Sequence, residues 1–232
     1  MLLPWDTEFW GIRIGRVEGG GLTPDLLARV DAWAAEQDVR CLYFLADGAD
    51  ARAPQAAEKG GFRLMDVRVE LRRPAGREIA DGVREARPDD DEALRAIARS
   101  SHRVTRFYAD PNFPDARCDD LYETWIAQSL GGWAQQVLVA DVGDGAAGYV
   151  SCHLDAEAGR GSIGLIAVDE RARGAGLGVA LSRAAVDWCT ANGAETMSVV
   201  TQGRNTQALR TFERAGFVVD DLGLWLHKWY GS

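Results

Sequence analysis

The chain has 232 residues, and its 26 Lys and Arg against 35 Asp and Glu give a formal net charge of −9 at pH 7. This acidic balance excludes a protein that holds nucleic acid by overall positive charge. A hydrophobic content of 47% with 26% charged residues is that of ordinary globular domains, which excludes a disordered chain, a collagen and a coiled coil.

Neither a membrane span nor a targeting segment is predicted. No run approaches the ~18 apolar residues of a membrane helix, and the opening residues 1–6 have no basic region ahead of an apolar core. We therefore expect a cytoplasmic protein with neither membrane nor nucleic acid among its partners. The 4 cysteines lie far apart, without a Cys-x-x-Cys pair, so we expect reduced thiols and no metal site.

The first third of the chain predicts a Gly-rich turn, an amphipathic helix, a strand, a second helix ending in Gly, and a closing strand. Thr23 is suited to cap the first helix, and Pro24 to occupy its first position. Residues 72–82 then hold Pro74, Gly76 and Gly82 among charges, which indicates a connection.

After this connection we expect a short strand over 83–86 and then a helix. The acidic run Asp89–Glu92 lies in the first turn of that helix, where carboxylates interact favourably with the helix dipole and Asp89 can cap. We prefer this interpretation to a metal site. Later in the chain, we expect helices over 178–192 and 205–215 and strands over 163–168, 196–201 and 223–229.

The two ends of the chain resemble each other at an offset of 155 residues. Gly61-Phe62 matches Gly216-Phe217, Glu58-Lys59 matches Glu213-Arg214, and Trp33 matches Trp188, all without a gap. Because the matches keep register through predicted loops, we interpret them as an ancestral duplication. We predict two units, over residues 1–75 and 83–230.

The strongest motif is Arg173-Gly174-Ala175-Gly176-Leu177-Gly178, between the apolar strand and a helix. Such a loop binds phosphate, because consecutive N–H groups and a helix N-terminus meet an anion that small residues let approach. Residues 171–186 also hold three arginines and no Asp or Glu. The dinucleotide fingerprint is excluded because Val179 stands where it needs Gly, and no Walker Gly-Lys-Ser/Thr is present.

This motif resembles the R/Q-x-x-G-x-G/A signature of the GNAT superfamily of acetyl-CoA-dependent N-acyltransferases. The spacing of Asn205, Ala208 and Phe212 ahead of Gly216-Phe217 is similar to the family's later helix and strand. The resemblance covers residues 83–230. It implies an α/β (α+β) fold with a mixed, mostly antiparallel central sheet flanked by helices. Here a smaller, degenerate GNAT-like half domain over 1–75 would precede it and wall the acceptor site.

By this resemblance, acetyl-CoA is the co-substrate. Backbone amides from Arg173 to Val179 would hold its pyrophosphate, the strand before the loop would pair with its pantetheine arm, and Asn205 would hydrogen-bond that arm. The implied coenzyme-binding residues are Ile166, Ala167, Val168, Arg173, Gly174, Ala175, Gly176, Leu177, Gly178, Val179, Asn205, Ala208 and Phe212.

A narrower resemblance concerns the acceptor. Residues 5–11, 106–113 and 122–126 look like those of superfamily members that acetylate the 4-amino group of a nucleotide-linked deoxysugar and also carry an extra N-terminal domain. An arginine with several aromatic side chains suits a nucleotide diphosphate. The implied acceptor residues are Arg106, Phe107, Asp110, Phe113, Tyr122 and Trp125. Alternatively, these aromatic residues pack the two domains together.

The sequence assigns no general base. His102 and Asp110 are candidates, His153 and His227 are weaker ones, and a carboxylate such as Asp66 could act through water. Phe212 stands where many relatives carry a tyrosine thought to protonate the departing thiolate. Because a thiolate leaves readily near neutral pH, we expect an active enzyme without that acid.

We therefore predict an N-acetyltransferase that acts on a primary amine of a small molecule, by direct attack in a ternary complex. Its expected acceptor is a nucleotide-linked amino sugar or a related natural-product amine. A protein N-terminal or lysine acetyltransferase and a non-catalytic coenzyme-binding module are the alternatives. We expect a monomer or a homodimer.

Overall fold

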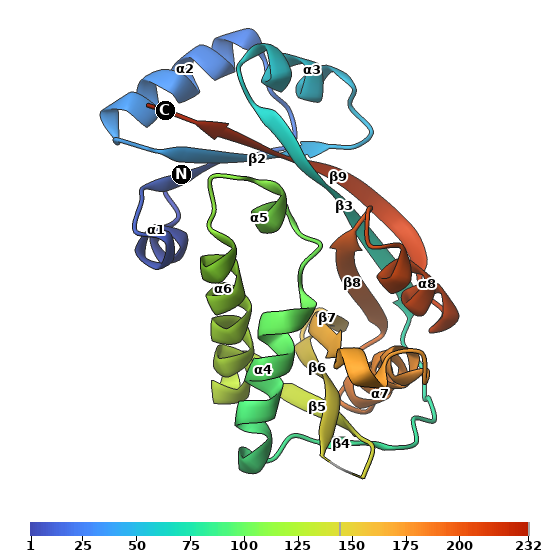
Figure 1. The fold of residues 1–232 in the computed structure, drawn as a ribbon. Coiled ribbons are helices and arrows are strands. Elements are labelled where there is room, and N and C mark those ends of the chain that lie inside the picture. The colour runs from blue at the N-terminus through green and yellow to red at the C-terminus, as the bar shows by residue number, and fades with distance from the viewer. Residues whose placement is uncertain (144, 232) are drawn as a thin grey trace.

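The computed structural model describes residues 1–143 and 145–231, in which a nine-stranded sheet is flanked by helices (Figure 1). The strands lie in the order β1-β2-β9-β3-β8-β7-β6-β5-β4. Within the described residues, the pairs β1–β2 and β7–β8 are parallel and the other pairs are antiparallel. The predicted fold class is confirmed.

The strands are β1 Ile14–Val17, β2 Cys41–Asp47, β3 Arg63–Pro74, β4 Val83–Glu85, β5 Gln136–Asp141, β6 Ala146–Asp155, β7 Arg160–Val168, β8 Thr196–Gln202 and β9 Val218–Trp229. The helices are α1 Pro4–Trp10, α2 Pro24–Glu36, α3 Arg52–Lys59, α4 Asp91–Ser101, α5 Arg106–Ala109, α6 Asp115–Gln128, α7 Leu177–Ala191 and α8 Thr206–Arg214. Short helical turns η1 Pro88–Asp90, η2 Ser129–Trp133 and η3 Glu170–Ala172 complete the chain.

Several strands are longer than predicted, and the differences at β3 and β9 are instructive. β9 begins at Val218 rather than Gly223, and β3 runs to Pro74, so the connection to β4 starts at residue 75 rather than 72. Both extensions are paired, Val218 with Arg72 and Pro74 with Thr196. The pairing partner lies far away in the sequence, so no local signal could place these ends.

The cap ahead of α4 also differs from the prediction. Asp90 rather than Asp89 accepts the N–H of Arg87 at 2.7 Å, and it forms an ion pair with Arg84 at 2.7 Å. The Arg84 hydrogen bonds lower the pKa of Asp90. Asp90 is buried and Asp89 exposed, because the turn of η1 rotates one carboxylate inward.

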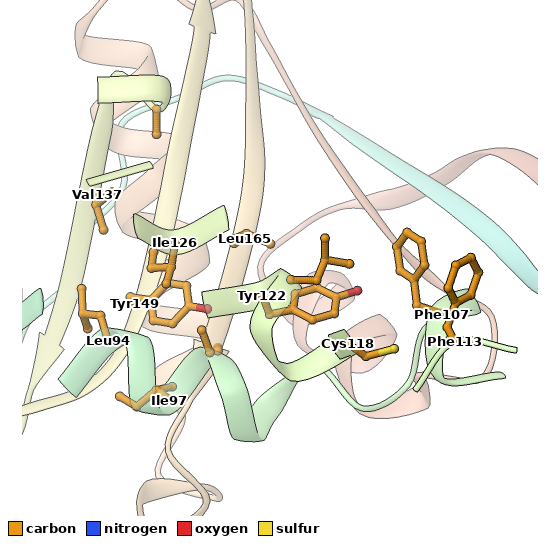
Figure 2. Packing of buried hydrophobic residues seen from close by; sticks show 14 of the residues in the cluster. Leu94, Ile97, Phe107, Phe113, Cys118, Tyr122, Ile126, Val137, Tyr149 and Leu165 are labelled. Atoms are coloured by element: carbon orange, nitrogen blue, oxygen red, sulfur yellow. The ribbon is translucent and has the colours of Figure 1, made fainter. Parts of the chain in front are cut away.

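Separate apolar cores lie on the two faces of the sheet. On one face, side chains of α4 and α6, among them Leu94, Ile97 and Ile126, gather around Tyr149 of β6 (Figure 2). On the other face, α7 and α8 pack Leu181 and Phe212 against β3, β6, β7 and β8. A third core joins α2 and α3 to β2 and β9. On the first face, α4 and α6 pack against β5, β6 and β7, while residues of β3 and β8 line a cleft.

The offset of 155 recurs in the structure. Residues 41–47 and 63–74, which form β2 and β3, correspond to residues 196–202 and 218–229, which form β8 and β9. The pairing of β3 with β9 is reciprocal, because Leu64 pairs with Leu226 while their counterparts Val219 and Leu71 pair with each other. Arg68 pairs with Gly223, its own counterpart. An approximate two-fold axis therefore passes through the sheet at this pair.

In this symmetric arrangement, the closing strands β3 and β9 of the two halves lie side by side, each next to strands of the other half. β9 lies between β2 and β3, and β3 lies between β9 and β8, so each half of the chain contributes a strand that the other half encloses. The two halves therefore share one continuous sheet. The division into units at 1–75 and 83–230 remains a prediction.

A buried polar cluster joins β9 to the segment between α5 and α6. Asp110 accepts hydrogen bonds from His227 Nδ1 at 2.7 Å and Trp229 Nε1 at 2.8 Å, and also from the N–H and side chain of Asn112. Arg106 Nη1 donates to His227 Nε2 at 2.9 Å, which leaves the proton of the neutral ring on Nδ1. Burial lowers the pKa of His227 to about 4, and these hydrogen bonds hold the pKa of Asp110 at about 2.

We predict that Asp110→Asn lowers the free energy of unfolding at pH 7 by about 2–3 kcal/mol. The pKa of Asp110 is lower in the folded state than the ~3.9 of an unfolded chain, so its stabilisation is complete above that value and declines as the pH falls towards 2. Urea denaturation of both proteins from pH 7 to pH 3 should show the difference narrowing below pH ~4. Asp81→Asn, at an exposed position, is the control. A difference that does not change with pH would contradict the prediction.

Candidate functional site

β7 and β8 lie side by side over only part of their length. Their parallel pairing runs from Arg160–Thr196 to Ile163–Val199, and β7 then continues to Val168 with no partner on that edge among the described residues. β8 instead stays paired with β3 as far as Gln202. We call the point after Ile163 and Val199, where the two strands part, the vertex.

The edge of β7 beyond the vertex carries unpaired N–H groups. The N–H of Leu165 donates to Ser151 Oγ at 2.8 Å and that of Asp169 donates to the Ala147 carbonyl at 2.8 Å, both towards β6. Because successive N–H groups alternate between the two edges of a strand, those of Ile166 and Val168 point to the edge that β8 has left. An extended ligand with amide groups can pair there as a strand would.

The loop after β7 presents a second set of free N–H groups. Gly174 and Gly176 have φ of +87° and +81°, which favour glycine, and a Cβ at either position would meet nothing within 4 Å. The N–H groups of residues 174–178 have no acceptor within 1–143 and 145–231. They lie at the N-terminus of α7, which has 15 residues, so the dipole adds to their attraction for an anion.

The positive charge of this loop rests on Arg173. Arg171 is 2.6 Å from Asp169, and Arg183 is 3.9 Å from Glu78. The hydrogen bonds that Asp169 accepts from Arg171 hold the pKa of the Asp169 carboxyl at about 2. Of the three arginines counted in the sequence, Arg173 is therefore the one that forms no ion pair with a carboxylate of the described residues.

The corresponding loop in the N-terminal half is closed. The N–H of Asp47 donates to the Gly20 carbonyl at 3.3 Å, so this loop folds back onto the end of β2. At the start of α2, Thr23 Oγ1 accepts the N–H of Leu26 at 3.2 Å, and Pro24 has no N–H to offer. The N-terminus of α2 therefore offers fewer free donors than that of α7, because one N–H is satisfied by Thr23 and another is missing at Pro24.

The three residues predicted on the later helix lie on α8. Asn205 caps this helix, since its Oδ1 accepts the N–H of Ala208 at 3.1 Å and its Nδ2 stays available as a donor. Ala208 is half-buried. Phe212 is 2% exposed and packs against Phe217, with ring centroids 5.9 Å apart. The space around position 212 is therefore apolar.

His153 lies at the vertex, although the sequence made it only a weaker candidate for the general base. A Cβ on Gly164 would collide with His153 Nε2 and with Ser151 Oγ, so the imidazole covers the glycine at which β7 and β8 part. No group in the described chain hydrogen-bonds this ring. Partial burial lowers the pKa of His153 below its usual value, so the ring is neutral at pH 7 and can accept a proton. In the sequence, the only local sign of this arrangement is the glycine at position 164, which leaves room for the imidazole of His153.

The two predicted catalytic candidates are occupied by other contacts. His102 Nε2 lies 3.0 Å from the Tyr149 hydroxyl, its ring stacks on Tyr122 at 4.5 Å, and burial lowers its pKa to about 4. Asp110 accepts four hydrogen bonds in the buried cluster described above. Both side chains are therefore engaged in contacts within the protein.

The six predicted acceptor residues do come together, but as a packed cluster. Phe107 and Phe113 are 4% and 3% exposed, and Trp10 of α1 lies 4.2 Å from Phe113. The Arg106 guanidinium lies over Tyr43 at 4.1 Å and over Trp225 at 4.3 Å. Tyr122 is buried and Trp125 half-buried in the same core. The arrangement favours the packing role, which the sequence also allowed.

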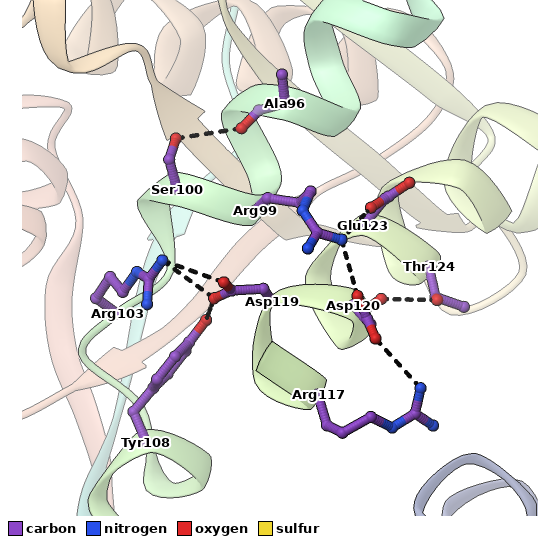
Figure 3. A network of polar contacts seen from close by, with 10 residues as sticks. All are labelled: Ala96, Arg99, Ser100, Arg103, Tyr108, Arg117, Asp119, Asp120, Glu123 and Thr124. Atoms are coloured by element: carbon purple, nitrogen blue, oxygen red, sulfur yellow. Dashed lines mark hydrogen bonds and ion pairs between the residues drawn. The ribbon is translucent and has the colours of Figure 1, made fainter. Parts of the chain in front are cut away.

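Ion pairs between α4 and α6 fix the segment that leads to His102. Arg99 lies between Asp120 and Glu123, at 2.8 and 2.6 Å, and Arg103 contacts Asp119 at 3.2 Å (Figure 3). Each pair is partly exposed and individually weak. As a network, they hold the end of α4 against α6.

Two kinds of feature are absent from the described residues. None of the helices there is long and apolar enough to cross a membrane. In the same ranges, no three His, Cys, Asp or Glu side chains come together as a metal site would require.

Comparison with known proteins yields consistent matches. The model of the acetyltransferase (GNAT) family matches residues 94–217. The chain is 32% identical to the dTDP-fucosamine acetyltransferase of Escherichia coli O6:H1, over 97% of this chain and 96% of that protein. It is 28% identical to the N-alpha-acetyltransferase 30 of Homo sapiens, over 65% of this chain and 40% of that protein. The crystal structure of a GCN5-related N-acetyltransferase from Sphaerobacter thermophilus shares the fold, with a TM-score of 0.64 at 17% identity, over 88% of this chain and 66% of that one.

We predict that Gly174→Asp weakens the binding of coenzyme A by about 100-fold or more, because a carboxylate would meet the pyrophosphate. Gly19→Asp is a matched control, since Gly19 is the counterpart at the same offset, has φ +79° and also has nothing within 4 Å of a Cβ. Both variants carry the same backbone strain. Calorimetry should show affinity lost only in the first variant and one site per chain in the wild type. Equal effects, or two sites per chain, would contradict the assignment.

Proposed function

The chain belongs to the GNAT acetyltransferase family, and from this premise we propose that it transfers the acetyl group of acetyl-CoA to a primary amine of a nucleotide-linked amino sugar. Membership of the family makes the protein an acyltransferase, and GNAT acetyltransferases use acetyl-CoA. The open edge of β7 beyond the vertex is the observation that carries the proposal.

The residues around that edge fit acetyl-CoA. The N–H groups of 174–178, with Arg173, would hold the pyrophosphate. The N–H groups of Ile166 and Val168 would pair with the amides of the pantetheine arm, and Asn205 Nδ2 could donate to it. Bound in this way, acetyl-CoA would supply an acetyl thioester as the electrophile.

The acceptor class rests on the relative that matches both halves of the chain. That relative is a dTDP-fucosamine acetyltransferase and matches 97% of this chain, whereas the N-alpha-acetyltransferase matches 65%. A peptide acceptor is therefore the weaker alternative. The non-catalytic alternative is less well supported, because His153 stands free at the vertex.

Few side chains are needed for the chemistry. An amine must lose a proton as it attacks, and His153, neutral and unbonded, can accept it at Nε2. A backbone N–H on the open edge of β7 can stabilise the developing negative charge on the acetyl oxygen. The scaffold positions the two reactants, which accounts for much of the rate enhancement in such reactions.

A panel of amines tests the proposed function. Thiol release from acetyl-CoA would be measured with dTDP-linked 4-amino sugars, free amino sugars and peptides side by side. We expect the highest kcat/KM with a dTDP-linked amino sugar. Preference for peptides would favour the alternative, and tight acetyl-CoA binding without turnover of any amine would favour a non-catalytic module.

We predict that His153→Gln lowers kcat by ~10²–10⁴-fold without changing the affinity for acetyl-CoA. The base works unprotonated, so wild-type kcat should fall as the pH drops through the pKa of His153, which burial places below the usual ~6.5. This acid limb should disappear in the variant. His102→Gln tests the other candidate, and loss of the acid limb in that variant instead would contradict the assignment.

We predict that Phe212→Tyr leaves kcat within about threefold and lowers the free energy of unfolding by ~1–3 kcal/mol, because its hydroxyl would be buried without a partner. Position 212 is 2% exposed and lies against Phe217. Steady-state kinetics and urea denaturation measure the two effects. A rise in kcat of ~100-fold would show instead that a proton donor at this position limits the reaction.

A further inference from the structure

A cleft of about 860 Å³ lies on the open part of the sheet, on the face that carries α4 and α6. Its floor is one row of side chains across five strands, because the register pairs Val218 with Arg72, Arg72 with Ser198, Ser198 with Ser162 and Ser162 with His153. The volume is that of a site for a small organic ligand. None of the residues that sequence analysis assigned to the acceptor lines this cleft.

An exposed tryptophan forms one wall. Trp133 is 57% exposed, and its ring meets the edge of His153 with centroids 5.0 Å apart. It follows Gly131-Gly132, where Gly132 has φ +102°, so a tight turn directs the ring away from the core. A large aromatic side chain left in solvent beside a cleft offers a planar surface on which a nucleobase can stack.

The opposite side of the cleft suits a diphosphate. The side chains of Arg72 and Arg160 are 56% and 70% exposed. Arg160 pairs with the exposed Asp155, and Arg72 pairs both with the exposed Asp220 and with Glu70, which is 16% exposed and is also bound by Arg68. The exposed pairs with Asp155 and Asp220 contribute little, so phosphate oxygens can replace these two carboxylates at small cost, while Glu70 keeps Arg68 as a partner. The hydroxyls of Ser162 and Ser198 have no hydrogen-bond partner in the part of the chain that the structure describes, and both lie on the floor.

One end of the cleft lies next to the vertex. Ser198 lies two residues before Val200, the first position of β8 beyond the vertex, so floor and vertex are about 7 Å apart along the strand. One hexose ring bridges such a distance. His153 belongs to both, since it ends the floor row and covers Gly164.

From these contacts we propose that the cleft is the nucleotide subsite of the acceptor. The base stacks on Trp133, the diphosphate lies between Arg72 and Arg160 over the two serines, and the amino sugar reaches the vertex beside His153. This assignment rests on the proposed function and moves the nucleotide away from the buried Arg106 cluster.

Steady-state kinetics of Trp133→Ala test the assignment, with a dTDP-linked 4-amino sugar and the same amino sugar without the nucleotide. We expect KM for the nucleotide-linked amine to rise by about 10- to 100-fold, with KM for the free amino sugar and for acetyl-CoA unchanged. Arg160→Gln should raise the same KM. Trp5→Ala is the matched control, since Trp5 is a partly exposed tryptophan of α1 that contacts the aromatic cluster instead. A rise in KM in Trp5→Ala and none in Trp133→Ala would overturn the proposal.

Calorimetry with dTDP alone separates failure of the subsite from failure of the proposed function. We expect the wild type to bind dTDP and Trp133→Ala to bind it at least tenfold more weakly. Equal affinity in both, or no binding to the wild type, overturns the subsite even if sugar nucleotides are acetylated. Conversely, dTDP binding that depends on Trp133 supports the subsite even if the enzyme proves to acetylate an amine other than a dTDP-linked amino sugar.

Discussion

The parting of β7 and β8 after Ile163 and Val199 is the constraint on which the site depends. A strand that loses its neighbour exposes a row of N–H and carbonyl groups, which a folded protein normally pairs or covers. Here the row faces a gap that leads from the glycine loop of α7 to His153. In the proposed function, the backbone supplies the binding edge, the anion site and the positions of the reacting groups, and few side chains take part.

The opening persists because β8 is held elsewhere. It pairs with β3 over seven residues, and β3 pairs with β9, which in turn lies against β2. The approximate two-fold axis at Arg68 and Gly223 makes these contacts reciprocal, so the N-terminal half supports the strand geometry of the C-terminal half. The same half has a closed loop ahead of α2, where Thr23 and Pro24 replace free donors. The C-terminal half thus carries the open edge and the glycine loop, and the N-terminal half supports the sheet around them.

Polar residues in this protein are divided between structure and chemistry by their surroundings. Arg106, Asp110 and His227 are residue types that often occur in functional sites, yet here they hydrogen-bond to one another. Together they connect β9 to the segment before α6. Arg72 and Arg160, of the same type, lie exposed on a cleft and can exchange partners. The difference is burial, because a buried charge without its partners is costly while an exposed one is free to bind.

The glycine loop, the cap at Thr23 and the offset of 155 could be predicted from the sequence, since each depends on neighbouring residues or on a repeated pattern, and the fold class followed from the resemblance to a known family. The tertiary structure alone decided the rest. It turned Asp90 inward instead of Asp89, packed Phe107 and Phe113 into the core, and set His153 over Gly164. It also aligned Arg72, Ser198 and Ser162 in one row. The row and the position of His153 depend on strand pairing between residues far apart in the chain, where a shift of one residue would turn every side chain to the other face of the sheet. The burial of Phe107 and Phe113 depends on packing against the distant residues Tyr43 and Trp10.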